Sequence, residues 1–233
     1  MKRLTFSFIL CSILLSPLTA LDPYLSLNLD INYSALGFAT MMKPYSDGVL
    51  VIPQEYDEIR EEAIKILLED ARWIFSGMIY GFSFRYVPGN REETLAEVFE
   101  LSPIKQIPNG DPAMKVQQVL DDTQYLSVLF YYWPDEYQNR RLKVSRGGGF
   151  HSSAAAGVVP MMLEDARTLS LIEAVKQAIR ADLRDLIYNR PLEVSGSVYL
   201  SGPPRINIRS GEYRSSVKIL YRREDMKTFP INY

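Results

Sequence analysis

The segment from Arg146 to Pro160, RGGGFHSSAAAGVVP, holds three consecutive glycines, two serines and His151, the only histidine in the chain. A serine hydrolase needs its histidine fixed against a nucleophile and a carboxylate, with the nucleophile in a Gly-x-Ser-x-Gly turn. That pattern is absent, and the glycines precede His151 instead of following it as they would in an oxyanion loop. Because the small residues show no periodicity, we predict that residues 143–160 form a mobile linker. His151 would then have no catalytic role.

Acidic pairs are the other residues whose types could support chemistry: Glu69-Asp70, Asp121-Asp122 and Glu164-Asp165. None of them has the spacing of a calcium-binding loop, and a single histidine leaves little for a transition-metal site. Two carboxylates at a set distance could hydrolyse a glycan, but sequence spacing alone does not place them so. There is no Walker loop and no dinucleotide fingerprint. We therefore expect no cofactor and no metal, and we assign no catalytic residue.

The first twenty residues have the order of a secretory signal peptide. Lys2 and Arg3 precede an apolar run over residues 4–15, and the small residue Ala20 follows. The run is shorter than the roughly 20 residues that a membrane-spanning helix needs. We therefore predict cleavage after Ala20 and no membrane span in the mature chain.

Cys11, the only cysteine, lies inside this predicted leader, and the bulky Leu10 before it argues against a lipid attachment site. Cleavage would leave a mature protein without cysteine and therefore without disulfides. An exported protein without disulfides fits a bacterial periplasm or envelope better than a eukaryotic secretory route, where small domains are usually cross-linked. We predict a periplasmic or secreted bacterial protein.

The predicted mature chain has 213 residues, with 24 basic and 28 acidic side chains and a formal net charge of −4 once Lys2 and Arg3 are removed. This length suits one large or two small domains and permits a substantial core. Nucleic-acid binding normally requires a basic surface. We therefore expect no nucleic-acid partner.

Hydrophobic periodicity predicts the main elements. Apolar and polar residues alternate over residues 24–33, YLSLNLDINY, as they do in a half-buried strand. Apolar residues recur every three or four positions over residues 54–80 and 163–188, which predicts two long amphipathic helices. We expect four helix residues to be buried, namely Leu67, Ile74, Ile179 and Leu183. We expect three to be exposed, namely Arg72, Lys176 and Arg184.

Each predicted helix is followed by a strand, over residues 81–89 and 194–202, and then by a hairpin, over residues 115–133 and 205–223. This succession predicts an α+β fold of two helix-plus-three-strand antiparallel units, an internal duplication, preceded by an N-terminal strand. The corresponding boundaries are 1–20 for the signal peptide, 21–142 for the first unit, 143–160 for the linker and 161–233 for the second unit. A chance succession of common elements stays open as the alternative.

Four consecutive aromatic residues, Phe130, Tyr131, Tyr132 and Trp133, end the first predicted hairpin. On a strand, such a run must present rings to both faces of the sheet. The core accounts for one face. The other face packs against a helix or a neighbouring segment, or it forms a binding surface for an envelope protein or a glycan, since tyrosine and tryptophan are enriched in interfaces.

The sequence favours an exported, non-enzymatic envelope protein with a binding, scaffold or assembly role through its sheet surfaces. The basis for this expectation is an export signal combined with the lack of a recognisable catalytic set. Two alternatives stay open. One is a carboxylate-based hydrolase of an envelope polymer, and the other is a carrier that holds a small ligand between the two units.

Overall fold

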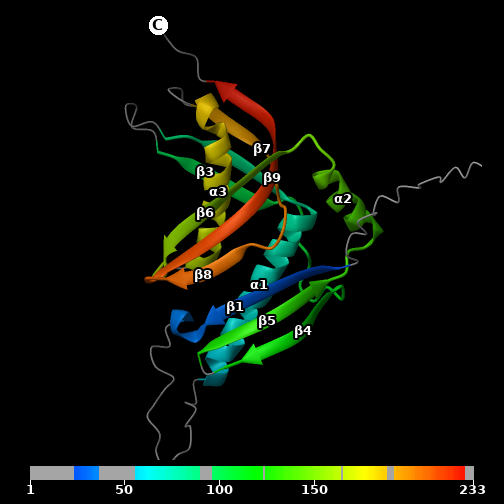
Figure 1. Cartoon of the computed structure of the whole chain (residues 1–233), viewed down its shortest axis with the longest axis vertical. Helices are drawn as coiled ribbons and strands as arrows, with labels where there is room; N and C mark the ends of the chain where they lie inside the picture. The colour runs from blue at the N-terminus through cyan, green and yellow to red at the C-terminus, as the bar shows by residue number, and fades with distance from the viewer. Residues whose placement is uncertain are drawn as a thin grey trace, which may run out of the picture.

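The computed structural model describes residues 24–36, 56–89, 96–122, 124–163, 165–187 and 192–228. Within these ranges the chain forms three α-helices, one 3-10 helix and nine strands in two antiparallel sheets (Figure 1). The predicted α+β class with an N-terminal strand is confirmed. The predicted signal peptide, with Cys11 and its cleavage site, lies outside the described residues. None of the described helices is long and apolar enough to cross a membrane.

The smaller sheet has three strands, with β5 (Tyr125–Tyr132) between β1 (Leu25–Asn32) and β4 (Met114–Asp121). A 3-10 helix, η1 (Tyr33–Leu36), follows β1. Strand β1 alternates as predicted: Leu27, Leu29 and Ile31 are buried, and the intervening polar residues are exposed. The long helix α1 (Tyr56–Ile79) packs across the inner face of this sheet (Figure 1).

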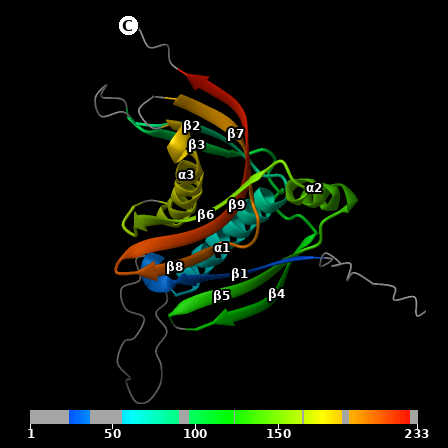
Figure 2. The ribbon, with the colours of Figure 1, turned by 45° about the horizontal axis from the view of Figure 1, so that its top comes forward.

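The larger sheet has six strands. They are β2 (Phe82–Val87), β3 (Val98–Pro103), β6 (His151–Pro160), β7 (Leu192–Leu200), β8 (Arg205–Arg209) and β9 (Glu212–Thr228). Their order is β3-β2-β7-β9-β6, and β8 pairs with β9 beside this path. Figures 1 and 2 show the sheet curving around helix α3 (Ala166–Ile187), with β6 on one side of the helix and β2 and β3 on the other.

Residues 143–160 do not form a linker, contrary to the prediction. Helix α2 (Glu136–Arg146) extends into this range, and β6 pairs with β9 along its whole length, from His151 to Pro160. The small residues serve close packing on α3. A Cβ atom on Gly157 would lie 2.3 Å from both the backbone nitrogen of Ala174 and the carbonyl oxygen of Ser170. Because α3 packs so close to this strand, the strand has small side chains where it contacts the helix. It therefore lacks the alternation of large apolar residues by which strands are recognised in sequences.

The structure does not confirm the predicted duplication. In the C-terminal half β7, β8 and β9 belong to one sheet, whereas in the N-terminal half β2 lies in the larger sheet and the β4–β5 hairpin in the smaller one. Strand β2 pairs directly with β7, with Phe82 opposite Val198. One hydrophobic core also contains residues from Leu27 to Tyr221. The two predicted units therefore share a sheet and a core.

The predicted helix faces are largely confirmed. Leu67, Ile74, Ile179 and Leu183 are fully buried, and Arg184 is exposed. Arg72 and Lys176 are half-buried instead of exposed. The Lys176 ammonium reaches Glu97 and Glu173 at 3.3 and 2.7 Å. Long cationic side chains can bury their stems while their charged ends reach polar partners, which a helical repeat of apolar residues does not reveal.

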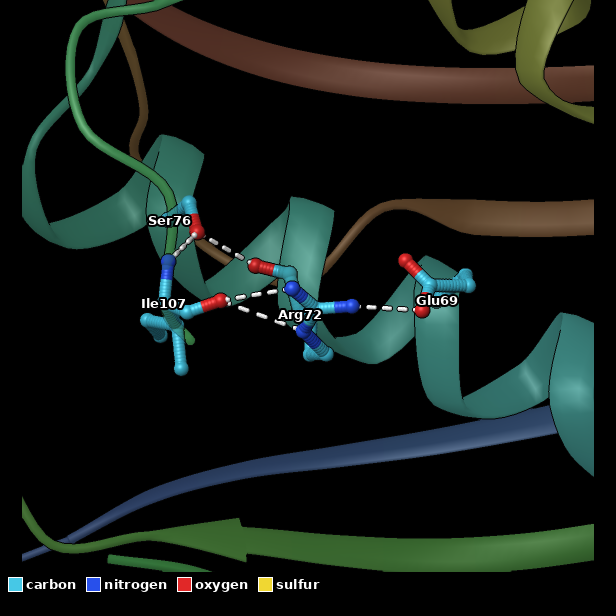
Figure 3. A network of polar contacts seen from close by, with 4 residues as sticks. All are labelled: Glu69, Arg72, Ser76 and Ile107. Carbon is cyan, nitrogen blue, oxygen red and sulfur yellow. Dashed lines mark hydrogen bonds and ion pairs between the residues drawn. The ribbon is translucent and has the colours of Figure 1, made fainter. Parts of the chain in front are cut away.

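Arg72 and Ser76 of α1 fix the connection between β3 and β4, as Figure 3 shows. Arg72 donates from Nε and Nη2 to the carbonyl oxygen of Ile107 at 3.1 and 3.0 Å, and its Nη1 donates to Glu69. The backbone N–H of Ile107 donates to Ser76 Oγ at 2.9 Å. Because Ile107 is fully buried, its backbone groups need such partners. Helix α1 thereby anchors the segment that passes from one sheet to the other.

We predict that Gly157→Ala destabilises the protein by about 2 kcal/mol, because the added methyl group must push the α3 backbone away from β6. Gly202→Ala is the matched control, since a Cβ atom there meets nothing within 4 Å. The control should stay within about 0.5 kcal/mol of wild type. Urea unfolding measures both variants. Equal stability of the two variants would contradict the close packing of β6 on α3.

Candidate functional site

The aromatic run on β5 divides between the two faces of the smaller sheet. Phe130 and Tyr132 are each 1% exposed and belong to the core. Tyr131 is half-buried on the opposite face, and Trp133, which directly follows the strand, is 45% exposed. Of the four residues singled out in the sequence, only Tyr131 and Trp133 are therefore available to a partner.

Tyr24 adds a third ring that the sequence analysis did not single out. Its ring centroid lies 4.8 Å from that of Tyr131 and 6.0 Å from that of Trp133. The rings of Tyr131 and Trp133 are stacked, with centroids 5.8 Å apart and planes inclined by 27°. The pairing of β1 with β5, which places Ser26 opposite Tyr131, brings these segments together. We call Tyr24, Tyr131 and Trp133 the aromatic cluster.

Polar side chains continue the outer face of the sheet beyond the aromatic cluster. Exposed polar residues follow β1 at alternate positions: Ser26, Asn28, Asp30 and Asn32. The hydroxyl of Ser127 on β5 donates to Asn28 Oδ1 at 3.3 Å. On β4, Lys115 lies opposite Tyr131. The eight residues of each strand make this face about 26 Å long. It therefore combines ring surfaces at one end with hydrogen-bonding groups along its length.

Asp121 secures the end of β4 to the rest of the protein. Its Oδ1 accepts hydrogen bonds from the hydroxyls of Tyr33 at 2.6 Å and Tyr56 at 2.7 Å, and its Oδ2 accepts one from Arg60. Partial burial alone would raise the pKa of the Asp121 carboxyl, but the hydrogen bonds from Tyr33, Arg60 and Tyr56 hold this pKa below its usual range. Asp121 therefore joins the edge of the smaller sheet to η1 and α1.

The acidic pair Glu69-Asp70 also has partners. Asp70 forms a buried ion pair with Arg167, and Glu69 pairs with Arg72. Glu164 lies outside the described residues. Within the described part of the chain, no three His, Cys, Asp or Glu side chains gather as a metal ion would require. Among the described acidic residues singled out in the sequence, no three therefore come together as one group.

His151 is held at the start of β6 and does not lie in a hinge. Its Nδ1 is 3.9 Å from Asp182 Oδ2, and its Nε2 is 3.4 Å from the Nη2 atom of Arg223. Tyr221, the strand partner of His151, also donates its hydroxyl to Asp182. Ser153, on the same face of β6, donates its hydroxyl to the carbonyl oxygen of Ala178 at 2.8 Å. Ser153 is therefore engaged with α3 and does not form a serine–histidine pair.

Comparison with known proteins places the chain among its relatives. A protein-family model matches residues 23–229. The chain belongs to that family. It is also similar to an uncharacterized protein from Treponema pallidum (strain Nichols), with 24% identity over 170 residues that cover 72% of this chain and 71% of the relative. This bacterial relative supports the expected bacterial origin. No solved structure matches the chain.

We predict that Asp121→Asn removes a part of the stability that depends on pH. Because the folded-state pKa of Asp121 lies below the ordinary value of 3.8, its ionised form stabilises the fold at neutral pH. That stabilisation is lost as the pH falls from about 4 through the folded pKa. Thermal melts of wild type and variant should therefore differ most at neutral pH and converge in acid.

Tyr56→Phe is a graded companion to this variant, because it removes one hydroxyl donor to Asp121 and keeps the aromatic ring. Its effect should be smaller than that of Asp121→Asn and should vanish over the same pH range. A difference between wild type and Asp121→Asn that stays constant from neutral to acid pH would contradict the role assigned to this carboxylate.

Proposed function

We propose that this protein is an exported, non-enzymatic binding protein of the bacterial envelope and that it binds its partner on the outer face of the smaller sheet. The aromatic cluster is the observation that carries this proposal. Three mutually contacting rings lie on a solvent-facing surface, and Trp133 keeps 45% of its surface exposed. Tyrosine and tryptophan at such positions are the residues that most often dominate binding energies.

The composition of the face favours a glycan chain as the partner. One side of a sugar ring presents C–H groups, which pack on the electron-rich face of an aromatic ring. Sugar hydroxyls need donors and acceptors, which Ser26, Asn28 and Ser127 supply beside the rings. The face is formed by a sheet and extends for about 26 Å. An extended polymer could contact the rings and the polar rows at the same time.

The predicted export and the partners of two carboxylates, Asp70 and Asp121, support a binding role. The family match begins at residue 23, after the predicted leader, and the relative from Treponema pallidum is bacterial. Glycan hydrolysis requires two carboxylates that both face the substrate. In this chain Asp70 is engaged by Arg167 in the interior, and Asp121 accepts hydrogen bonds from two tyrosines and an arginine. These contacts favour structural roles for both carboxylates.

Co-sedimentation with purified insoluble peptidoglycan tests the proposal. We predict that the exported protein sediments with peptidoglycan and that Trp133→Ala weakens this binding about tenfold, as is typical for a central aromatic contact. Tyr137→Ala is the matched control, because Tyr137 is 50% exposed on α2, outside the outer face of the smaller sheet. The control should bind within about twofold of wild type.

Thermal melts of both variants show whether the fold is intact, and an exposed ring should contribute little to stability. Failure of the wild-type protein to sediment, or equal weakening by Trp133→Ala and Tyr137→Ala, would contradict the proposal. Sedimentation that persists after lysozyme has solubilised the glycan strands would also contradict it, because it would reflect aggregation of the protein instead of binding to glycan.

A further inference from the structure

A hollow with a volume of about 670 Å³ opens on the larger sheet, in a region separate from the aromatic cluster. It is bordered by β6 at Ala154, by β9 at Ser216 and Lys218, by β8 at Arg205, and by the connection between β7 and β8 at residues 201–203. We call it the β8–β9 basin. Ser216 and Lys218 are exposed, whereas Ser215 between α3 and the sheet is fully buried. The basin therefore lies on the face of the sheet that points away from α3.

The basin results from a gap in strand pairing. Strand β8 pairs with β9 as far as Ser216, and β7 takes over from Ile219. Between these positions the backbone carbonyl of Lys218 accepts hydrogen bonds from Ser201, at 2.9 Å from the backbone N–H and 3.1 Å from the hydroxyl. These bonds fix the connection between β7 and β8 as one wall, and the small side chain of Ala154 leaves room above the sheet.

Two cations border this space, Arg205 and Lys218. Their cationic neighbours on β9 are paired: Arg214 lies 3.0 Å from Glu212, and Arg222 lies 3.3 Å from Glu224. Within the described residues, neither Arg205 nor Lys218 has a carboxylate within 4.0 Å. The chain as a whole is acidic, with a formal net charge of −2. The basin is thus a local site of uncompensated positive charge, with serine hydroxyls beside it.

We infer that the β8–β9 basin binds a dianionic phosphate group of a small molecule or of a lipid headgroup. Arg205 offers a planar set of N–H donors that suits phosphate oxygens, and Lys218 adds a compact second charge. The hydroxyl of Ser216 is a further donor at the same site. The volume lies within the range of small-ligand sites. The inference goes beyond the proposed function and uses a different sheet, so the two can fail independently.

Titration of the exported, ¹⁵N-labelled protein with inorganic phosphate at pH 7.5 and constant ionic strength tests the inference by NMR. We expect saturable shifts of the backbone amide signals at Ala154, Ser216 and Lys218, and weaker shifts with acetate, which carries a single charge. Arg205→Gln and Lys218→Gln should each weaken phosphate binding about fivefold or more, because each removes a charged hydrogen-bond donor.

Two further variants separate a shaped site from general charge attraction. Arg209→Gln removes the same charge from the same strand outside the basin and should leave the affinity within about twofold of wild type. Ala154→Leu keeps both positive charges but fills the space above the sheet with a larger side chain. It should therefore abolish phosphate binding. The absence of saturable shifts, equal weakening by Arg209→Gln and Arg205→Gln, or full binding by Ala154→Leu would each overturn the inference.

Two phosphate monoesters then identify the source of the ligand. The first is soluble glycerol 3-phosphate, and the second is phosphatidic acid in vesicles. If only glycerol 3-phosphate competes with inorganic phosphate, the ligand is a soluble compound. If the protein co-sediments with the vesicles and Arg205→Gln abolishes this binding, the ligand is a lipid headgroup. The inference that the basin takes a phosphate-bearing ligand is wrong if glycerol 3-phosphate does not compete with inorganic phosphate and the vesicles show no binding that depends on Arg205.

Discussion

The buried ion pair between Asp70 and Arg167 is the contact on which the arrangement of the two sheets depends. Asp70 belongs to α1, which covers the smaller sheet, and Arg167 lies in the first turn of α3, inside the curve of the larger sheet. Their exposures are 6% and 7%, and Arg167 also donates to the backbone carbonyl of Asp30 on β1 at 2.9 Å. Charges withdrawn from water need partners of this kind. One guanidinium thus joins both helices and an edge strand.

At this junction the helices cover the inner face of each sheet, and within the described residues the outer faces carry exposed side chains. Antiparallel sheets commonly have one buried and one solvated face. The aromatic cluster lies on the outer face of the smaller sheet, where the pairing of β1 with β5 brings Tyr24 beside Tyr131. The β8–β9 basin lies on the outer face of the larger sheet, where the pairing of β9 is interrupted. Both proposed binding surfaces therefore follow from the strand pairing that builds the core.

Local periodicity was sufficient to predict some elements and not others. The alternation in β1 and the apolar faces of α1 and α3 were predicted because burial of residues such as Leu29 and Ile179 follows the repeat of the element itself. Strand β6 was not predicted because glycine is needed at position 157 to let α3 approach closely. That approach joins distant parts of the chain, and no local sequence pattern reveals it. The predicted duplication failed to appear because strand partnership is a long-range property: β2 pairs with β7 across more than one hundred residues.

The candidate site was only partly predictable for the same reason. The aromatic run identified Tyr131 and Trp133, but the third ring, Tyr24, depends on the register between β1 and β5. The β8–β9 basin could not be found from sequence, because it depends on where β9 exchanges one neighbour for another. In the aromatic cluster and in the β8–β9 basin, the residue types indicate the chemistry of the surface. The residues come together only through the pairing of distant strands, which the sequence does not reveal.

A double-mutant cycle on the junction tests most directly whether the two sheets form one body. Asp70→Asn and Arg167→Met should each cost about 3–5 kcal/mol, because each leaves a buried partner without its opposite charge. The double variant should be more stable than the sum of the single losses implies, by at least about 1 kcal/mol, and every variant should unfold in a single transition seen equally by fluorescence and circular dichroism. Additive losses, or two separate transitions for the two sheets, would contradict the account.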